Sequence, residues 1–317
     1  MSQFNPKEIM FSATTLCNLH CAHCFVERRN QRLSIQKAQK FIASAMIPNA
    51  PIRLERIGFT GGEPFLYPEF IEEITKTAVK YELLFDQIMT NGVWWTDKEQ
   101  LKNTLQKIYN AGYDGKFGVS FDFFHGQSVE KLITFFTTIY DIWKDGSSIT
   151  IQSVIAEKKD DTEFLKKLDT FSKALGTRIS KKVDKKGVGI ITLKNNKIFI
   201  PIYRFKESHC SENIQNWNSK RWFKDDFCEG PGHVLYIHSN EKIAPCCGFA
   251  NENNALCLGT INNTFTEIIE ASRQNKMVKI CYEKGLAVKR RQMQKEGYKF
   301  PGITDDNCLF CDYLCKH

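Results

Sequence analysis

The stretch Cys17-Asn18-Leu19-His20-Cys21-Ala22-His23-Cys24-Phe25 places three cysteines with three residues and then two residues between them. Thiolates at such spacing can bind one face of an iron–sulfur cluster. Three thiolates on a four-iron cluster leave one iron open for chemistry, as an incomplete ligand set does on zinc. The spacing alone leaves two alternatives open, a zinc knuckle that lacks its fourth ligand and a set of buried thiols in a helix.

The residues around this stretch favour the iron–sulfur cluster over these two alternatives. Residues 8–14 read as a strand, so the cysteines fall in the loop that follows it. A second strand, 56–60, ends in Gly61-Gly62-Glu63-Pro64. In these two motifs, together with the aromatic Phe25 after the last cysteine, the chain resembles the radical SAM superfamily. The motifs cover the first 65 residues, and the strand–helix pattern extends the resemblance to about Leu193.

Strands alternate with amphipathic helices along the first two thirds of the chain. Strands are expected at 83–90, 116–121, 148–154 and, more weakly, 178–180, and helices at 34–45, 68–78, 97–108, 132–143 and 161–175. Such alternation predicts an α/β fold with a parallel sheet, either a barrel or a doubly wound sheet. The resemblance implies a partial (β/α)6 barrel followed by a small cysteine-rich α+β auxiliary-cluster domain. A hairpin over 187–200 sets the predicted boundary, with the barrel at 1–195 and the second domain at 196–317.

Ligands of parallel sheets gather at the carboxyl ends of the strands, where several polar residues and glycines of this chain fall. The resemblance implies that Cys17, Cys21 and Cys24 hold a 4Fe-4S cluster whose open iron binds S-adenosyl-L-methionine. The residues predicted to contact that cofactor share this location: Phe25, Thr60, Gly61, Gly62, Glu63, Pro64, Asn91, Ser120, Asp122 and Ser153.

Four of these residues have a specific physical reason or a plainer alternative. Gly61 and Gly62 let backbone approach a ligand closely, because no side chain intervenes. Asn91-Gly92 is also a common turn signal, and Asp122 can simply cap a helix. His125, the histidine of this region, is more typical of a hydrogen-bonded structural residue than of a base.

A second set of cysteines lies in the last third of the chain. Cys228 and Cys246 are at the two ends of a predicted hairpin, and Cys308 and Cys311 form a terminal Cys-x-x-Cys. Four thiolates complete a closed iron–sulfur cluster, and a tetrahedral zinc site needs the same number. This region resembles the shortened SPASM or Twitch domains of radical SAM peptide-modifying (RiPP) enzymes, which implies one auxiliary 4Fe-4S cluster on these four residues. Cys257 or Cys315 can replace one of them.

Cys247 directly follows the predicted ligand Cys246. Neighbouring side chains on a strand point to opposite faces, so Cys247 would not reach the same cluster. A thiol is a good hydrogen-atom donor because its S–H bond is weak, although such a cysteine can equally pack as a small apolar residue. The Pro245-Cys246-Cys247 hairpin resembles that of radical SAM peptide epimerases. The resemblance implies Cα hydrogen abstraction by a 5′-deoxyadenosyl radical and hydrogen return from Cys247, converting an L-residue to a D-residue.

Two other functions stay open. A radical SAM enzyme with an auxiliary cluster can form a thioether or carbon–carbon crosslink, which would leave the peptide two mass units lighter. A function of another class is a non-catalytic iron–sulfur protein that senses redox state or iron. Absence of 5′-deoxyadenosine after reduction would favour the sensor, whereas the glycine motif argues against it.

The composition of the chain indicates where the protein is located and which partners it binds. The 317 residues carry a net charge of +8, and no apolar run is long enough to cross a membrane. Twelve cysteines without a secretory signal favour metal or redox use in a reducing cytoplasm. We expect a ribosomally made precursor peptide and a flavodoxin- or ferredoxin-type electron donor as partners, and neither nucleic acid nor membrane. The basic segment 284–299 can attract an acidic partner or be a solvated helix.

Overall fold

The computed structural model describes residues 4–122, 124–155, 158–183, 189–207, 210–224 and 234–317. The chain divides into two compact units. The central unit comprises residues 12–32 and 57–207, and the terminal unit comprises residues 1–11, 33–56 and 208–317. This division differs from the predicted boundary near residue 195, because the strand that follows it pairs within the central unit.

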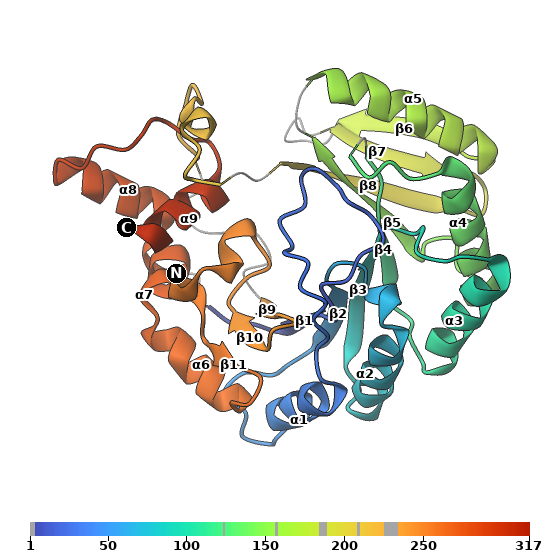
Figure 1. The fold of residues 1–317 in the computed structure, drawn as a ribbon, viewed down its shortest axis with the longest axis horizontal. Helices are drawn as coiled ribbons and strands as arrows, with labels where there is room; N and C mark the ends of the chain where they lie inside the picture. Colours follow the sequence, from blue (N-terminus) through green and yellow to red (C-terminus); the bar gives the residue numbers. More distant parts are fainter. Residues whose placement is uncertain (1–3, 123, 156–157, 184–188, 208–209, 225–233) are drawn as a thin grey trace. The chain divides into compact units, whose positions relative to one another are not determined.

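The central unit alternates strands and helices, as the sequence predicts. Its elements are β2 (Arg56–Thr60), α2 (Pro68–Lys80), β3 (Leu84–Thr90), α3 (Lys98–Asn110), β4 (Lys116–Ser120), α4 (Val129–Trp143), β5 (Ile149–Ile155), α5 (Lys158–Ala174), β6 (Arg178–Val183), β7 (Gly189–Lys194) and β8 (Phe199–Lys206). The strand order is β2-β3-β4-β5-β8-β7-β6. Helices α2 to α5 lie along one face of this sheet (Figure 1). The fold is therefore mixed α/β with a mainly parallel sheet.

Helix α3 begins directly after the predicted Asp97, and α4 begins at Val129, ahead of the predicted start at 132. Asp97 accepts a hydrogen bond from the Gln100 N–H at the start of α3, and Ser128 accepts one from Lys131 at the start of α4. Their apolar stripes meet buried strand residues on the covered face, such as Phe117 of β4. The rings of Phe117 and Phe135 of α4 contact edge to face at 6.3 Å. An aromatic core thus fixes the helices to the sheet.

The position beside β5 is taken by an unexpected strand. The sequence indicates a sixth strand at 178–180 only weakly, and β6, which contains these residues, pairs antiparallel with β7. Instead β8 runs parallel to β5, with Ile202 opposite Ile151. Ile200 and Ile202 are buried on the helix-covered face. Buried apolar residues at alternate positions make β8 the better inner strand, whereas the lysine-rich β6 suits an edge.

The terminal unit contains the remaining elements. They are β1 (Glu8–Ser12), α1 (Ile35–Ala45), β9 (Val234–Ile237), β10 (Lys242–Ala244), β11 (Gly259–Thr260), α6 (Phe265–Gln274), α7 (Lys276–Val278), a π-helix (Lys279–Lys284), α8 (Leu286–Lys295) and α9 (Asn307–Lys316). The chain also forms short 3₁₀ helices at Pro64–Leu66, Ile214–Trp217, Phe249–Glu252 and Asn254–Leu256. The strand order is β11-β10-β9-β1, and β1 runs parallel to β9. In the part of the chain that the structure describes, no helix has the length and apolar character needed to cross a membrane.

Residues 15–31, here called the cysteine loop, belong to the central unit, and their two ends meet at one point. The Thr14 hydroxyl donates to the Gln31 carbonyl at 2.7 Å, and the Gln31 N–H donates to the Thr15 hydroxyl at 2.9 Å. The Thr15 N–H also donates to the Gln31 carbonyl at 3.1 Å. These bonds close the base of the loop, so that the cysteines between them belong to one tied segment.

The backbone at and after the double glycine is hydrogen-bonded to the start of this loop. The Gly62 N–H donates to the Thr14 carbonyl, and the Glu63 N–H donates to the Leu16 carbonyl, each at 2.7 Å. A Cβ on Gly61 would lie 2.4 Å from the Thr14 oxygen, and one on Gly62 would lie 2.3 Å from the Leu16 oxygen. The glycines therefore permit the close approach of two backbone segments of the protein. From the sequence we expected them to permit the close approach of a ligand.

The Glu63 side chain extends this contact to the end of β3. It is fully buried, and it accepts hydrogen bonds from the Asn91 N–H at 2.7 Å, the Thr90 hydroxyl at 2.8 Å and the Phe65 N–H at 3.2 Å. Burial raises the pKa of Glu63 to about 7, although these hydrogen bonds act in the opposite direction. The carboxyl group thus ties the glycine motif to the residue that follows β3.

Replacing Gly62 by alanine should destabilise the protein by roughly 1–3 kcal/mol, because the added methyl group would push the Leu16 carbonyl away. Urea unfolding of the metal-free protein measures this loss. Gly126→Ala is the control, because nothing lies within 4 Å of its Cβ and only the positive φ of 58° opposes it. An unfolding midpoint for Gly62→Ala equal to that of the control would show that the contact is not needed.

The raised pKa of Glu63 also predicts a pH dependence of stability. The folded protein keeps this proton up to about pH 7, while the unfolded chain releases it near the ordinary value of 4.5. Stability from this group is therefore complete below about pH 4.5 and is lost as the pH rises through 7. Wild-type protein should lose roughly 3 kcal/mol more unfolding free energy than Glu63→Gln over this interval. Parallel pH curves for the two proteins, measured by urea unfolding without metal, would contradict the assignment.

Candidate functional site

The structure places the three predicted cluster cysteines in the cysteine loop. Cys17 and Cys21 are half-buried and Cys24 is exposed. The Leu19 N–H donates to the Cys17 sulfur at 3.4 Å, and the Cys24 N–H donates to the Cys21 carbonyl at 3.1 Å. Burial raises the pKa of the Cys17 thiol. Three thiols on one tied loop form a donor set that fits three irons of a four-iron cluster, and a bound metal would supply the positive charge that the thiolates need.

Asn91 lies against the first of these cysteines. Its side-chain NH₂ donates to the Asn18 side-chain oxygen at 2.8 Å and lies 3.8 Å from the Cys17 sulfur. Its side-chain oxygen accepts from the Val93 N–H at 2.8 Å. The structure therefore brings Asn91 and Cys17 together. The amide of Asn91 positions the loop, and its contact with the cofactor ribose stays a prediction.

Asp122, which is buried, and the half-buried His125 form a pair just after the end of β4. Asp122 accepts hydrogen bonds from the Phe124 N–H at 2.8 Å, the Val154 N–H at 3.3 Å and the His125 ring nitrogen at 2.7 Å. Burial lowers the pKa of His125, but hydrogen bonds with Asp122 and Cys21 outweigh it and raise the value to about 9. His125 is thus hydrogen-bonded, as the sequence favours, and it also contacts the cysteine loop, which was not predicted. The spacing Asp122-x-x-His125 after a strand was the available signal.

The predicted residues on β4 and β5 do not share one face. Ser120 lies opposite Gln152 in the parallel register, so that Ser153 points to the other face of the sheet. Ser153 is only 1% exposed and lies on the side covered by helices, with Ile149 and Ile151. The structure therefore brings Ser120 toward the carboxyl ends of the strands but does not place Ser153 beside it.

Three further predicted contacts have contrasting exposure. Phe25 is 49% exposed, and Pro64 is buried at the start of a 3₁₀ helix. The Thr60 carbonyl accepts a hydrogen bond from the Ala13 N–H at 2.9 Å. Thr60 and Pro64 thus hold the glycine motif in place from both sides, while Phe25 leaves an apolar ring at the surface of the cysteine loop. Contact of each with a cofactor stays a prediction.

In the terminal unit, three of the four predicted auxiliary ligands gather. A Cβ on Gly248 would lie 3.2 Å from the Cys308 sulfur and 3.9 Å from the Cys246 sulfur, so glycine leaves space between these two thiols. Cys311 is one helical turn beyond Cys308 on α9. Cys228 lies outside the described residues. Sequence reasoning missed Cys281, whose sulfur lies 3.7 Å from that of Cys311.

The structural basis for the role of Cys247 differs from the expectation. The sequence predicts a strand through Cys246 and Cys247, but β10 ends at Ala244. Pro245, directly after Ala244, has no backbone N–H to continue the ladder of hydrogen bonds. The two cysteines therefore lie in the irregular segment before the 3₁₀ helix Phe249–Glu252, and strand alternation does not fix their directions. Cys247 is half-buried.

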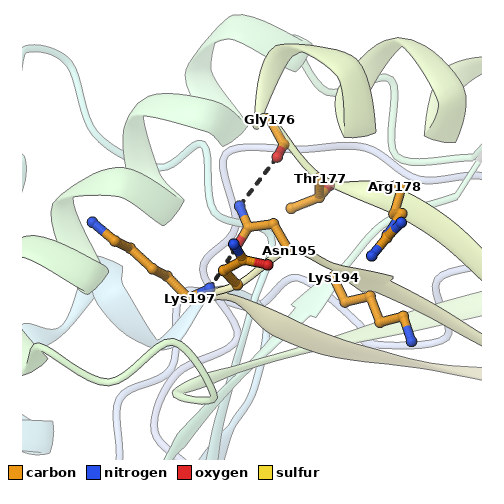
Figure 2. A pocket seen from close by; sticks show the side chains of 7 residues that line it. Gly176, Thr177, Arg178, Lys194, Asn195 and Lys197 are labelled. Atoms are coloured by element: carbon orange, nitrogen blue, oxygen red, sulfur yellow. Dashed lines mark hydrogen bonds between the residues drawn. The ribbon is translucent and has the colours of Figure 1, made fainter.

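A basic pocket lies at the other end of the central sheet. It has a volume of about 460 Å³, and the side chains of Arg178, Lys194 and Lys197 surround it (Figure 2). Arg178 and Lys194 face each other directly across β6 and β7, where like charges repel. Asn195 donates to the Gly176 carbonyl at 3.1 Å. Because β6 and β2 end the sheet of this unit on opposite sides, the pocket is separate from the cysteine loop.

Residues 11–144 match the model of the radical SAM superfamily. YydG of Bacillus subtilis (strain 168), which is named as a peptide biosynthesis protein, is 22% identical over 97% of this chain and 92% of its own length. The subtilosin biosynthesis protein AlbA of the same organism is 31% identical over 32% of this chain and 23% of its own length.

A solved structure of anSMEcpe with bound AdoMet and the Cp18Cys peptide has the same fold. It matches with a TM-score of 0.53 at 15% identity and covers 98% of this chain and 94% of that chain. At this identity the likeness concerns the fold alone. The superfamily match includes both the cysteine loop and the glycine motif that holds it. This chain therefore carries a radical SAM domain over residues 11–144.

Proposed function

We propose that this protein is a radical SAM enzyme that modifies a ribosomally made peptide. The observation that carries the proposal is the alignment of 97% of the chain with a peptide biosynthesis protein, over both the radical SAM domain and the cysteine-rich terminal unit. The tied cysteine loop supports it, because a cluster with an open iron needs three thiols from a preorganised segment.

Cys17, Cys21 and Cys24 would hold the 4Fe-4S cluster. When bound, the cluster and S-adenosyl-L-methionine supply a 5′-deoxyadenosyl radical, which removes a hydrogen atom from the substrate. The backbone of Gly62 and Glu63 fixes the start of the loop, and Asn91 orients Cys17 through Asn18. The residues of the glycine motif, with Asn91, Ser120 and Asp122, are the proposed surroundings of the cofactor.

The modification that we propose is L-to-D epimerisation at Cα. Cys247 gives one hydrogen atom to the planar carbon radical, on the face opposite to the one from which hydrogen was taken. The S–H bond breaks, a C–H bond forms, and Cys247 is left as a thiyl radical that one electron and one proton restore. The half-buried position of Cys247 supports this role, because such a thiol can meet both a substrate and a reductant.

Cys246, Cys308 and Cys311 would hold the auxiliary cluster. The space that Gly248 leaves between the Cys246 and Cys308 sulfurs fits a bound group. An electron carrier of the flavodoxin or ferredoxin type would supply electrons. A pocket of about 290 Å³ lined by Lys276, Lys279, Lys284 and Lys289 supports an acidic partner of this kind. This pocket includes part of the predicted basic segment.

The Cys247→Ala variant should separate hydrogen abstraction from the substrate from hydrogen return to it. It should still form 5′-deoxyadenosine from reduced enzyme, because the cluster cysteines are unchanged, but it should give no D-residue. In deuterium oxide the wild-type product should gain one deuterium for each converted residue, because a thiol proton exchanges with solvent. Chiral amino-acid analysis and mass spectrometry of the peptide measure both effects.

Cys257→Ala is the matched control, because Cys257 is half-buried in the same unit and its thiol lies 3.5 Å from the Gly259 carbonyl. Normal epimerisation by Cys247→Ala would remove Cys247 from the mechanism. A product that is two mass units lighter would replace epimerisation by crosslinking. Absence of 5′-deoxyadenosine in every protein would instead favour a non-catalytic iron–sulfur sensor.

A further inference from the structure

Strand β8 carries exposed aromatic side chains on the face of the central sheet that lies opposite α2 to α5. Phe199, Tyr203 and Phe205, here called the aromatic row, are 51%, 49% and 50% exposed. Side chains of a strand alternate between its two faces, so these three odd-numbered positions share one face. The even-numbered Arg204 lies on the other face, where its guanidinium is 4.4 Å from the centre of the Phe164 ring of α5. The aromatic row therefore points away from the helices (Figure 1).

The aromatic row is long enough to bind several residues of a partner. Residues two apart on a strand are about 6.6 Å apart, so the row from Phe199 to Phe205 spans roughly 20 Å. Pro201 lies on the same face, between Phe199 and Tyr203. Single exposed apolar residues are common on proteins, but a contiguous set of them marks an interaction site. Aromatic side chains are also enriched in protein interfaces.

Two cations adjoin the first residue of this row. Lys194 of β7 lies directly opposite Phe199, and Arg178 of β6 lies directly opposite Lys194. Directly opposite residues of antiparallel strands share a face, so both cations lie on the face of the aromatic row. Together with Lys197 they surround the basic pocket of about 460 Å³ (Figure 2), and no aspartate or glutamate is among the residues that line it. Three cations without a carboxylate attract an anionic partner.

The last residue of the aromatic row lies near the candidate functional site. Phe205 is opposite Val154 of β5 in the parallel register. The Val154 N–H donates to the carboxylate of Asp122 at 3.3 Å, and Asp122 is among the proposed surroundings of the cofactor. One face of the sheet therefore joins the basic pocket to the strand ends where the proposed chemistry takes place.

We propose that this face is a docking surface for the peptide substrate, with acidic side chains of the peptide in the basic pocket and apolar side chains along the aromatic row. The inference rests on the proposed function, because it takes the substrate to be a peptide. Carboxylates complement the cations of the pocket, and alternate apolar side chains of an extended peptide can pack on alternate residues of β8. A small anion would use the pocket alone and would leave the aromatic row without a role.

The length of the surface sets the spacing of the two parts of the peptide. An extended peptide advances about 3.3 Å per residue, so a row of roughly 20 Å corresponds to about six residues. We therefore expect the acidic residues of the substrate to be about six residues or more from the residue that is modified. The acidic segment would hold the peptide while a residue farther along it lies at the strand ends.

Other partners match this face less well. A second copy of the chain would bring the same cations to the pocket, and like charges repel. A membrane surface or a nucleic acid also offers anionic groups, but neither requires a row that ends beside the candidate functional site. The continuity of the row with Val154 and Asp122 thus favours a substrate.

The test measures binding of a fluorescein-labelled synthetic peptide to the full chain by fluorescence anisotropy. The first probe has three glutamates followed by three leucines that alternate with serines. In the second probe glutamines replace the glutamates, and in the third serines replace the leucines. Wild-type protein should bind the first probe roughly tenfold more tightly than either of the others, because each of them loses one set of contacts.

Two variants assign the two parts of the surface. Lys194→Gln should weaken binding of the first probe roughly fivefold but leave binding of the glutamine probe unchanged, because only the glutamates contact the pocket. Tyr203→Ser should weaken binding of the first probe by a similar factor but leave the serine probe unchanged. Tyr203→Phe keeps the ring and should bind the first probe like the wild type.

Lys181→Gln and Tyr109→Ser are the matched controls and should bind the first probe like the wild type. Lys181 is on β6 opposite Ile191, so it points to the face opposite to that of Arg178. Tyr109 is on α3 and is 43% exposed, which is close to the value for Tyr203. Circular dichroism of each variant reports whether it folds.

Equal losses in Lys194→Gln and Lys181→Gln would show a general effect of charge and would overturn the inference, as would wild-type protein that binds all three probes equally. Binding of phosphatidylserine vesicles or of a polyuridine oligonucleotide that Lys194→Gln and Tyr203→Ser both weaken, without binding of the first probe, would assign the face to another partner. Formation of 5′-deoxyadenosine by the reduced wild-type enzyme separates the two proposals. If it forms while docking fails, only the docking surface is overturned, and if it does not form, the proposed function fails as well.

Discussion

The backbone contact between the glycine motif and the start of the cysteine loop is the constraint on which the site depends. Two N–H···O bonds of 2.7 Å join Gly62 and Glu63 to the carbonyls of Thr14 and Leu16. Both segments come so close that any side chain at Gly62 would overlap the Leu16 carbonyl. Because the contact uses backbone atoms, it fixes the position of the backbone just before Cys17. This position does not depend on the side chains of the loop. The loop can therefore expose Cys24 and still start from a rigid base.

Glu63 joins this contact to the rest of the site. Its buried carboxylate accepts from the Asn91 N–H, and the Asn91 side chain reaches Asn18 and the Cys17 sulfur. In a low-dielectric interior each of these bonds strengthens its neighbours, and an unpaired member would be costly. The glycine motif, the end of β3 and the first cluster cysteine consequently form one hydrogen-bonded unit. On the other side of the loop, His125 holds Cys21 with Asp122 behind it. Two strand ends thus position two of the three thiols.

The sequence predicted those parts of the fold whose signals are local. Ser34 and Asp97 accept the hydrogen bonds of helix caps where the predicted helices 34–45 and 97–108 begin, and β9 and β10 pair as the predicted hairpin. The place of β8 beside β5 was not predictable in this way, because it depends on pairing between distant segments. The orientation of Ser153 was predictable, because Ile149 and Ile151 mark the buried face of β5. Ser153 comes two residues after Ile151 and therefore points to the same face. The mistaken strand at Cys246-Cys247 ignored the break that Pro245 imposes.

The two groups of cysteines differ in how much their spacing in the sequence can reveal. Cys17, Cys21 and Cys24 come from one loop, so their spacing in the sequence already shows that the three thiols lie close together. The thiols of the terminal unit come from separate elements, and Cys281 and Cys311 are 30 residues apart in the sequence. Only tertiary packing, with Tyr282 bonded to Pro245, brings them together. A metal bound across such elements stabilises their arrangement, because binding free energy then becomes folding free energy. The three thiols of the loop are held together wherever its base is closed, whereas the thiols of the terminal unit come together only when that unit has folded.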